Sequence, residues 1–218
     1  MVYAVRMMMA GLRERKKEQT RRRISQVALR LFDERGYDQV TVNEIAEAAG
    51  VAKVTLFSYF PTKECLVTDG VQDDMAAVVT GRPQGCSPIG ALRAHYGATA
   101  VPVAKDLDVQ TLITRIRVIS SSPALLAAVH GVQMGQRHEL AAALAGDGEP
   151  DLTAHLMAAQ ITAAITTLQE VFFQRLAAGA PLEEAARRLA ADVEVAFDLL
   201  EHGLTHTDEE KHEKGHQL

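Results

Sequence analysis

Apolar residues recur at intervals of three and four along most of the chain, which is the pattern of α-helices that bury one face. Glycine and proline residues divide this pattern into segments, and no stretch alternates apolar and polar residues for long enough to require a sheet. The sequence therefore predicts an all-α protein. The expected helices cover residues 21–35, 42–49, 53–59, 62–80, 89–105, 107–120, 122–145, 151–178 and 181–203.

Two short helices are expected on either side of Gly50. The first begins with a capping box, in which the hydroxyl group of Thr41 accepts a hydrogen bond from the amide three residues later and Glu44 accepts one from the amide of Thr41. Gly50 can take the left-handed conformation that ends a helix, and residues 53–59 form the next one. Two short helices joined by a glycine-containing turn predict a helix-turn-helix, whose second helix fits the major groove of DNA.

The second of these helices is expected to bury Leu56 and Phe60 and to expose its polar side chains. A lysine there can bind a phosphate or the edge of guanine, and hydroxyl groups can bind phosphates or touch a thymine methyl group. An ordinary helical hairpin with a solvated outer face would show the same spacing. The candidate contact residues are Lys53, Thr55, Ser58, Tyr59 and the nearby Lys63, and each lysine is expected to neutralise one phosphate.

Residues 20–66 resemble the DNA-binding domain of the TetR family of transcriptional regulators. The resemblance implies a three-helix helix-turn-helix domain followed by a helical bundle for regulation and dimerisation. It also implies a homodimer that binds a palindromic double-stranded DNA operator as a repressor and is released by a small hydrophobic effector. The residues that carry the resemblance are Ile24, Ala28, Leu31, Phe32, Gly36, Tyr37, Thr41, Ile45, Ala46, Ala49, Gly50, Val51, Thr55 to Phe60, and Lys63.

The resemblance extends the set of candidate DNA contacts, and two positions depart from the family pattern. Phe57 stands where tyrosine is usual, which removes a hydroxyl group that could bind a phosphate. Ala52 stands where a serine often caps the second helix, a loss of about 1 kcal/mol of helix stability. The full candidate set is Arg21, Arg22, Thr41, Val42, Lys53, Val54, Thr55, Phe57, Ser58, Tyr59 and Lys63.

Charge is distributed unevenly along the chain, whose net charge is -5. Residues 1–64 hold 12 Lys or Arg against 8 Asp or Glu, whereas the remaining 154 residues hold 11 against 20. A basic head on an acidic body is expected if only the head meets phosphate. The expected organisation is a disordered basic arm over 1–19, a DNA-binding domain over 20–66, a ligand-binding and dimerisation domain over 67–204, and a polar tail over 205–218. The arm either meets DNA phosphates or a minor groove or stays solvated.

The second half of the chain provides the candidate regulatory residues. Arg115 interrupts an apolar helical face and can bind the anionic end of a ligand, with an ordinary surface charge as the alternative. Residues 112–124 are similar to the regulatory halves of TetR relatives thought to sense acyl-CoA-like or other hydrophobic carboxylated compounds. The candidate ligand-binding residues are Leu112, Arg115, Ile116, Ile119 and Phe172.

The last two expected helices are rich in alanine, which allows helices to approach closely. By the resemblance, these helices pair with their copies from a second subunit in a four-helix bundle. An internal core would explain the same apolar pattern. The candidate dimer residues are Ala164, Leu168, Phe172, Val193, Phe197 and Leu200.

Other functions have less support in the sequence. No catalytic Ser/His/Asp set, phosphate-binding glycine loop or H-E-x-x-H motif is found, so we expect neither an enzyme nor a cofactor. The alternative to a DNA-binding regulator is a helical carrier or enzyme without a DNA role. The chain has two cysteines, Cys65 and Cys86, without C-x-x-C spacing, and this is typical of a protein in a reducing cytoplasm. A redox-responsive regulator that uses either thiol is a narrower alternative. His202 and His206 have the spacing of a metal pair, but no metal site is expected. No run of residues is expected to be long enough and sufficiently free of charge to cross a membrane.

Overall fold

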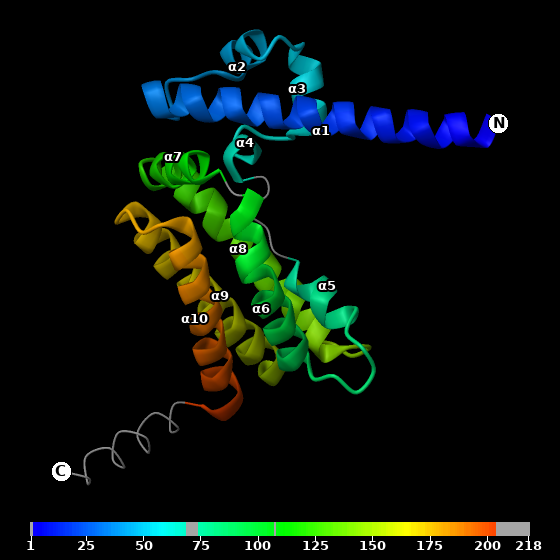
Figure 1. Ribbon diagram of the computed structural model, residues 1–218, viewed down its shortest axis with the longest axis vertical. Coiled ribbons are helices and arrows are strands. Elements are labelled where there is room, and N and C mark those ends of the chain that lie inside the picture. The colour runs from blue at the N-terminus through cyan, green and yellow to red at the C-terminus, as the bar shows by residue number, and fades with distance from the viewer. Residues whose placement is uncertain (1, 69–73, 107, 204–218) are drawn as a thin grey trace. The chain divides into compact units, whose positions relative to one another are not determined.

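All regular elements in the described residues are helices, which confirms the predicted fold class (Figure 1). The computed structural model describes the backbone of residues 2–68, 74–106 and 108–203, and the side chains of residues 15–68, 74–98 and 108–203. The helices are α1 (Val2–Arg35), α2 (Val42–Ala48), α3 (Lys53–Tyr59), α4 (Cys65–Thr68), α5 (Met75–Thr80), α6 (Pro88–Asp106), α7 (Val109–Ser120), α8 (Pro123–Ala145), α9 (Leu152–Ala177) and α10 (Leu182–His202).

The chain folds as two compact units. The head unit comprises Met1–Gln72 and Gln110–His130, and the body unit comprises Asp73–Val109 and Gly131–Leu218. The expected regulatory domain, residues 67–204, differs from this division because Gln110–His130 lies in the head unit. Val118 of α7 and Leu125 of α8 are buried in the core of that unit, a contact between distant parts of the sequence that helical periodicity does not reveal.

The head core is formed by one apolar face from each of the first four helices, and Figure 1 shows α2 and α3 together on one side of α1. Gly36 and Gly50 have positive φ angles of 85° and 62°, and they end the first two helices as the sequence predicts. The amide of Gly36 donates to the carbonyl of Phe32 at 2.9 Å. The buried residues of these helices and their turns are Ile24, Ala28, Leu29, Phe32, Tyr37, Val40, Ile45, Ala46, Ala49, Leu56, Phe60, Leu66 and Val67.

The N-terminal part of α1 differs from its prediction. The sequence predicts a disordered arm over residues 1–19, but α1 is helical from Val2. The physical reason is local: Leu, Arg, Lys, Glu and Gln favour helix, and Nε of Arg22 pairs with Oε1 of Glu18 one turn away at 2.7 Å. A helix about 10 Å across does not fit a minor groove about 6 Å wide, so the minor-groove alternative does not apply to this conformation.

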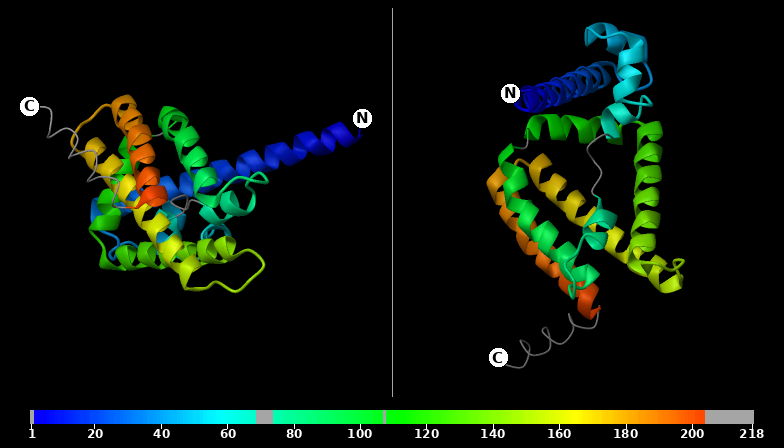
Figure 2. Two further views of the ribbon diagram at one scale, coloured as in Figure 1. Left: turned by 90° about the horizontal axis from the view of Figure 1, so that it is seen from below. Right: turned by 90° about the vertical axis from the view of Figure 1, so that its right-hand side faces the viewer.

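The body unit places α6, α9 and α10 side by side (Figures 1 and 2). Ion pairs link α10 to both neighbours: Nη2 of Arg93 in α6 lies 2.6 Å from Oδ1 of Asp198, and Arg175 of α9 pairs with Asp192. The helices expected after residue 88 are confirmed to within two residues. The buried core residues are Met75, Val79, Leu92, Leu140, Ala141, Ala158, Ile161, Ile165, Leu168, Val193 and Phe197.

The single helix expected over residues 62–80 is instead described as two shorter helices, α4 and α5. Asp74 explains the second start, because its side chain accepts a hydrogen bond from the amide of Ala77 at 2.8 Å and so caps α5. Residues 69–73 and the predicted polar tail over 205–218 lie outside the described residues.

The helix α9 is long and apolar enough to cross a bilayer, judged by length and composition, and α7 and α8 together pass the same test with a bend of 104°. The prediction that no run has these properties is therefore wrong. In the structure, Ala158, Ile161 and Ile165 of α9 are buried in the core of the body unit, and core helices of globular proteins commonly pass this test.

Candidate nucleic-acid interface

The helix α3 is fixed against the head core. Leu56 lies on its inner face, Phe60 follows at its C-terminal end, and each is 0% exposed. Arg21 of α1 donates from Nη1 to the carbonyl of Tyr59 at 3.2 Å, and its guanidinium carbon lies 4.9 Å from the centroid of the Phe60 ring. This arginine satisfies a carbonyl at the end of α3 and stacks on an aromatic ring beside it. The outer face of α3 is therefore presented by a helix anchored at its C-terminal end and along its buried side.

Five side chains on α3 are exposed: Lys53, Val54, Thr55, Phe57 and Ser58. Val54 is 82% exposed and Phe57 39%. The hydroxyl group of Ser58 donates to the carbonyl of Thr55 at 2.7 Å, so its oxygen can still accept a hydrogen bond. The face combines one cation, two apolar side chains and two hydroxyl groups, which suits phosphates and base edges together. These five predicted contact residues lie together on one helix, as the sequence predicts.

The predicted capping box is present at the start of α2. The amide of Thr41 donates to Oε2 of Glu44 at 2.8 Å, and the amide of Glu44 donates to Oγ1 of Thr41 at 3.3 Å. The hydrogen bond from the Thr41 amide, followed by those from the Thr41 hydroxyl group and Arg35, lowers the pKa of Glu44 to about 2. Thr41 thus caps the helix, and Val42 is half-buried against the head core. A DNA contact by either residue stays a prediction.

Three further candidate contacts already have partners within the head unit. Arg21 holds the end of α3, Arg22 pairs with Glu18, and Tyr59 is half-buried against the head core. The partner of Arg21 lies 38 positions away, which explains why the run of basic residues alone suggested only phosphate binding. The contacts of Arg21 and Tyr59 help to position α3, whereas the pair that Arg22 makes lies within α1. Phosphate contact by these three residues stays a prediction.

Lys63 lies inside a cluster of aromatic and acidic groups. Its ammonium group donates to the carbonyl of Tyr37 at 2.6 Å and lies 3.9 Å from the centroid of the Tyr37 ring and 5.4 Å from that of Phe32. Burial lowers the pKa of Lys63. The Tyr37 hydroxyl group donates to Oε1 of Glu64 at 2.7 Å, and burial together with this bond raises the pKa of Tyr37. The ammonium group of Lys63 therefore stabilises the head from within in addition to its predicted phosphate contact.

Lys53 and Lys63 should differ when each is replaced by alanine. Lys53→Ala should flatten the dependence of log K on log salt concentration by about one unit per half-site, because each neutralised phosphate contributes about 0.9. Lys63→Ala should change that slope less and lower the melting temperature of the head more, because it removes a partly buried hydrogen bond and cation–π contacts. Fluorescence anisotropy at several salt concentrations and thermal melting measure both effects. Equal slopes for the two variants would place Lys63 on a phosphate after all.

The helix-turn-helix region matches a known family. Residues 24–69 match the model of the bacterial regulatory proteins of the tetR family. The chain belongs to the TetR family of transcriptional regulators. This family is non-enzymatic, which agrees with the prediction that the chain is not an enzyme.

Known TetR relatives match parts of the chain. TcmR of Streptomyces glaucescens is 33% identical over 124 residues, which cover 54% of this chain and 55% of TcmR. RutR of Escherichia coli (strain K12) is 27% identical over 139 residues, which cover 62% of this chain and 65% of RutR. The chain thus spans between about half and two thirds of these curated relatives. The chain shares its fold with the structure of NalD, the secondary repressor of the MexAB-OprM multidrug efflux pump in Pseudomonas aeruginosa. The match has a TM-score of 0.51 and 17% identity, and it covers 87% of this chain and 97% of NalD.

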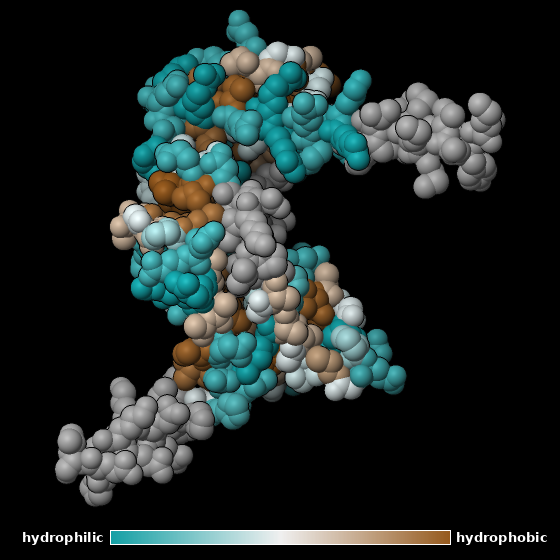
Figure 3. Space-filling model, viewed as in Figure 1, coloured by the Kyte–Doolittle hydropathy of each residue, from teal (hydrophilic) through white to brown (hydrophobic). Residues whose placement is uncertain are grey.

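The candidate ligand-binding residues of this TetR family member are divided between the two units. Phe172 is buried in α9 of the body unit, whereas the other four are half-buried on α7 of the head unit. Figure 3 shows an apolar surface over α7. The four residues on α7 are Leu112, Arg115, Ile116 and Ile119.

Arg117 makes a contact that the sequence does not signal. Its Nε and Nη2 donate to Oδ1 and Oδ2 of Asp33 in α1, both at 2.8 Å, across 84 positions of the chain. This hydrogen bonding raises the pKa of Arg117. The two-pronged pairing joins α7 to the first helix of the TetR head.

The candidate dimer residues fall into two groups. Phe172, Val193 and Phe197 are 8%, 2% and 0% exposed within a single copy, so the structure uses them in the core of the chain itself. Apolar periodicity marks buried positions but not the partner that covers them, and this explains the difference. The remaining three, Ala164, Leu168 and Leu200, border a groove of about 560 Å³ along α9 and α10, and of these Leu168 is also buried in the body core. The apolar lining of that groove includes Ala164, Leu168, Val171, Val195, Leu199 and Leu200.

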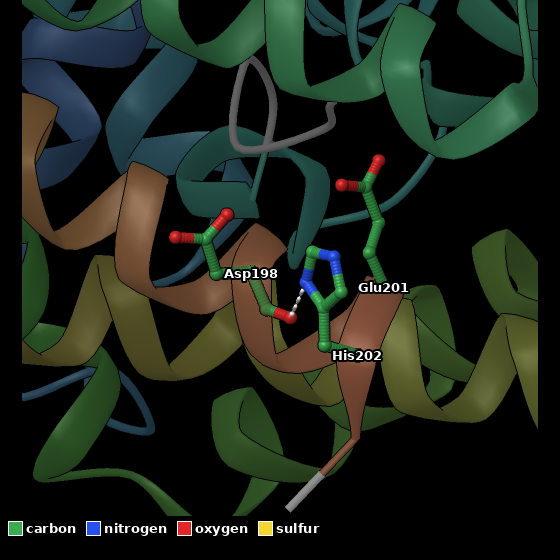
Figure 4. A group of neighbouring side chains, drawn as sticks. All are labelled: Asp198, Glu201 and His202. Carbon is green, nitrogen blue, oxygen red and sulfur yellow. Dashed lines mark hydrogen bonds between the residues drawn. The ribbon is translucent and has the colours of Figure 1, made fainter. Parts of the chain in front are cut away.

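One group of three possible metal ligands occurs in the described part of the chain, at the C-terminal end of α10 (Figure 4). The ligand atoms of Asp198, Glu201 and His202 lie within 4.8 Å of one another. Arg93 already pairs with both carboxylates, with Nη2 at 2.6 Å from Asp198 and 3.1 Å from Glu201, and Nδ1 of His202 lies 3.1 Å from the Asp198 carbonyl. The group is accounted for as an ion-pair network between α6 and α10. His206, considered with His202 above, lies outside the described residues.

Proposed function

We propose that this TetR family member binds a palindromic DNA operator as a homodimer, represses transcription from it, and leaves it when a small hydrophobic effector binds. The observation that carries the DNA-binding part is the exposed face of α3, where Lys53, Val54 and Thr55 project from a helix whose Leu56 and Phe60 are fully buried. Such a helix can enter a major groove without rearranging the head. A regulator of this kind acts in the bacterial cytoplasm.

The groove on α9 and α10 supports the dimer. Val195 on α10 is 60% exposed, and it borders the groove together with Val171 and Leu199. On α9, the helix that carries Val171, the side chains of Leu152 and Leu156 are 74% and 53% exposed. An apolar surface that continues along two long helices fits a second copy of the same surface, because a two-fold interface brings identical patches together. The dimer residues that we propose are therefore those of the groove rather than the buried phenylalanines.

The contacts of α7 support a link between effector binding and the head. Val118 is buried in the head core, Ile119 packs against it, and Arg117 pairs with Asp33. An effector held by the half-buried apolar side of α7 would act on a helix that shares a core with the DNA-binding helices. The effector must bind better to the non-binding conformation by a few kcal/mol to release the operator. We propose Arg115 as the residue that binds its anionic end, through the forked guanidinium group.

Arg115→Ala should weaken the response to the effector and leave operator affinity without effector unchanged. A series of fatty acids and acyl-CoA thioesters of increasing chain length serves as the probe, and release of a labelled operator is the measurement. Arg187→Ala removes an exposed arginine of α10 and is the matched control. Loss of operator binding by Arg115→Ala in the absence of any ligand would assign the residue a structural role instead.

Selection of bound fragments from random duplex DNA tests the proposed function as a whole. The full chain should enrich a palindrome whose half-sites are centred about 10 base pairs, or a multiple of that distance, apart. Failure to enrich any sequence at low ionic strength would contradict the proposal. A palindrome would also count against the carrier alternative and against the redox alternative, for which the described residues offer two free cysteines in different units.

A further inference from the structure

Val54 has an exposure that the fold of the head does not explain. It is 82% exposed, more than any other large apolar side chain among the described residues, although Leu56 on the same helix is fully buried. Valine is also not a preferred residue in a helix interior, so helix propensity gives no reason for it. An apolar side chain in this position lowers its free energy when another apolar group covers it.

The other residues of α3 limit how the helix can distinguish bases. Its sequence, KVTLFSY, contains no Arg, Asn, Gln, Asp or Glu, which are the side chains that most often read base edges through paired or accepting hydrogen bonds. Lys53 is its single charged residue. Discrimination by α3 must therefore come from Lys53, from its three hydroxyl groups and from apolar contacts. Thymine is the base that presents a methyl group in the major groove.

We propose, on the basis of the DNA-binding function proposed above, that Val54 determines specificity by packing against the 5-methyl group of a thymine in each operator half-site. Valine has one strongly preferred side-chain rotamer in a helix, so its two methyl groups occupy fixed positions before DNA arrives. The helix itself is fixed by buried Leu56 and Phe60 and by the bond from Arg21 to its end. Little conformational freedom is lost when the contact forms. Phe57, one turn later, is less than half as exposed and borders the same surface.

Deoxyuridine tests this contact because it differs from thymidine only by the missing methyl group. The full chain is titrated with an operator selected from random DNA, and each thymine is replaced in turn. Loss of one buried methyl group should raise Kd about fourfold at one thymine per half-site, and about 16-fold when both half-sites are changed. Val54→Ala should bind thymine and uracil operators equally, and Val54→Ile should retain the preference for thymine. Leu126→Ala, which removes an exposed leucine of α8, should keep the full preference.

The possible outcomes separate this inference from the function on which it rests. An operator that is selected but has no methyl-sensitive thymine would overturn the role of Val54 and leave DNA binding in place. A preference for thymine that persists in Val54→Ala would assign the contact to another side chain and overturn it as well. Enrichment of no duplex at all would end both proposals. Thermal melting should be unchanged by Val54→Ala because the side chain is exposed, so a loss of affinity would report on DNA contact rather than on folding.

Discussion

Val195→Glu should convert the proposed dimer into monomers and raise the operator Kd about 100-fold or more. The side chain is 60% exposed in one copy and borders the groove along α9 and α10, so a second copy of this groove would cover it. A carboxylate buried in an apolar interface loses its hydration, and two-fold symmetry introduces it twice. A monomer then binds a single half-site and loses the effective concentration that links two heads on one operator.

Sedimentation equilibrium gives the oligomeric state of this variant, and operator titration gives its affinity. Leu126→Glu is the matched control, because it places the same charge on an exposed leucine outside the groove. Leu126→Glu should remain dimeric and bind the operator as the unchanged chain does. A dimer with undiminished affinity in Val195→Glu would place the interface elsewhere.

Local features of the recognition region could be predicted because a few neighbouring residues encode each of them. The hydroxyl group of Thr41 and the carboxylate of Glu44 lie three positions apart, and the structure contains both hydrogen bonds of their capping box. Gly50 alone permits the positive φ angle of its turn. Leu56 and Phe60 recur one turn apart and are both fully buried. The positions and ends of α2 and α3 follow from these signals.

Contacts between distant residues could not be predicted in the same way. A run of arginines suggests phosphate binding, but Arg21 holds a carbonyl 38 positions away. Arg117 pairs with Asp33 across 84 positions, and nothing near either residue indicates the other. Lys63 is bound to the carbonyl of Tyr37 within the head. Charged side chains have long reach and few local constraints, so only the fold decides whether they face DNA or a neighbour.

The same limit applies to the apolar residues of the last two helices. Periodicity identifies Val193 and Phe197 as residues that must be covered, and both are covered within one copy by the body core. Val195, two positions away on a different side of α10, is a large apolar side chain that the chain leaves exposed. A dimer surface on such a helix consists of the apolar residues that remain exposed after the chain has folded. These residues can be identified only from the folded structure.

Phe60→Ala and Phe197→Ala should produce opposite defects. Both side chains are 0% exposed, the first in the head core and the second in the body core. Replacing a buried phenylalanine by alanine lowers the free energy of unfolding by about 3–5 kcal/mol, a large part of the roughly 5–15 kcal/mol that stabilises a domain. Phe60→Ala should therefore abolish operator binding while the chain remains dimeric, and Phe197→Ala should disrupt the dimer first.

Operator titration, sedimentation equilibrium and thermal melting on the same samples distinguish the two defects. Phe57→Ala removes a nearby phenylalanine from the exposed side of α3, so it should leave the melting temperature nearly unchanged. If Phe60→Ala and Phe197→Ala each lost both dimerisation and operator binding at the same temperature, the two cores would unfold as one cooperative unit. In that case a defect in either core would spread to both functions, and only exposed positions such as Val54 and Val195 could separate DNA contact from dimer contact.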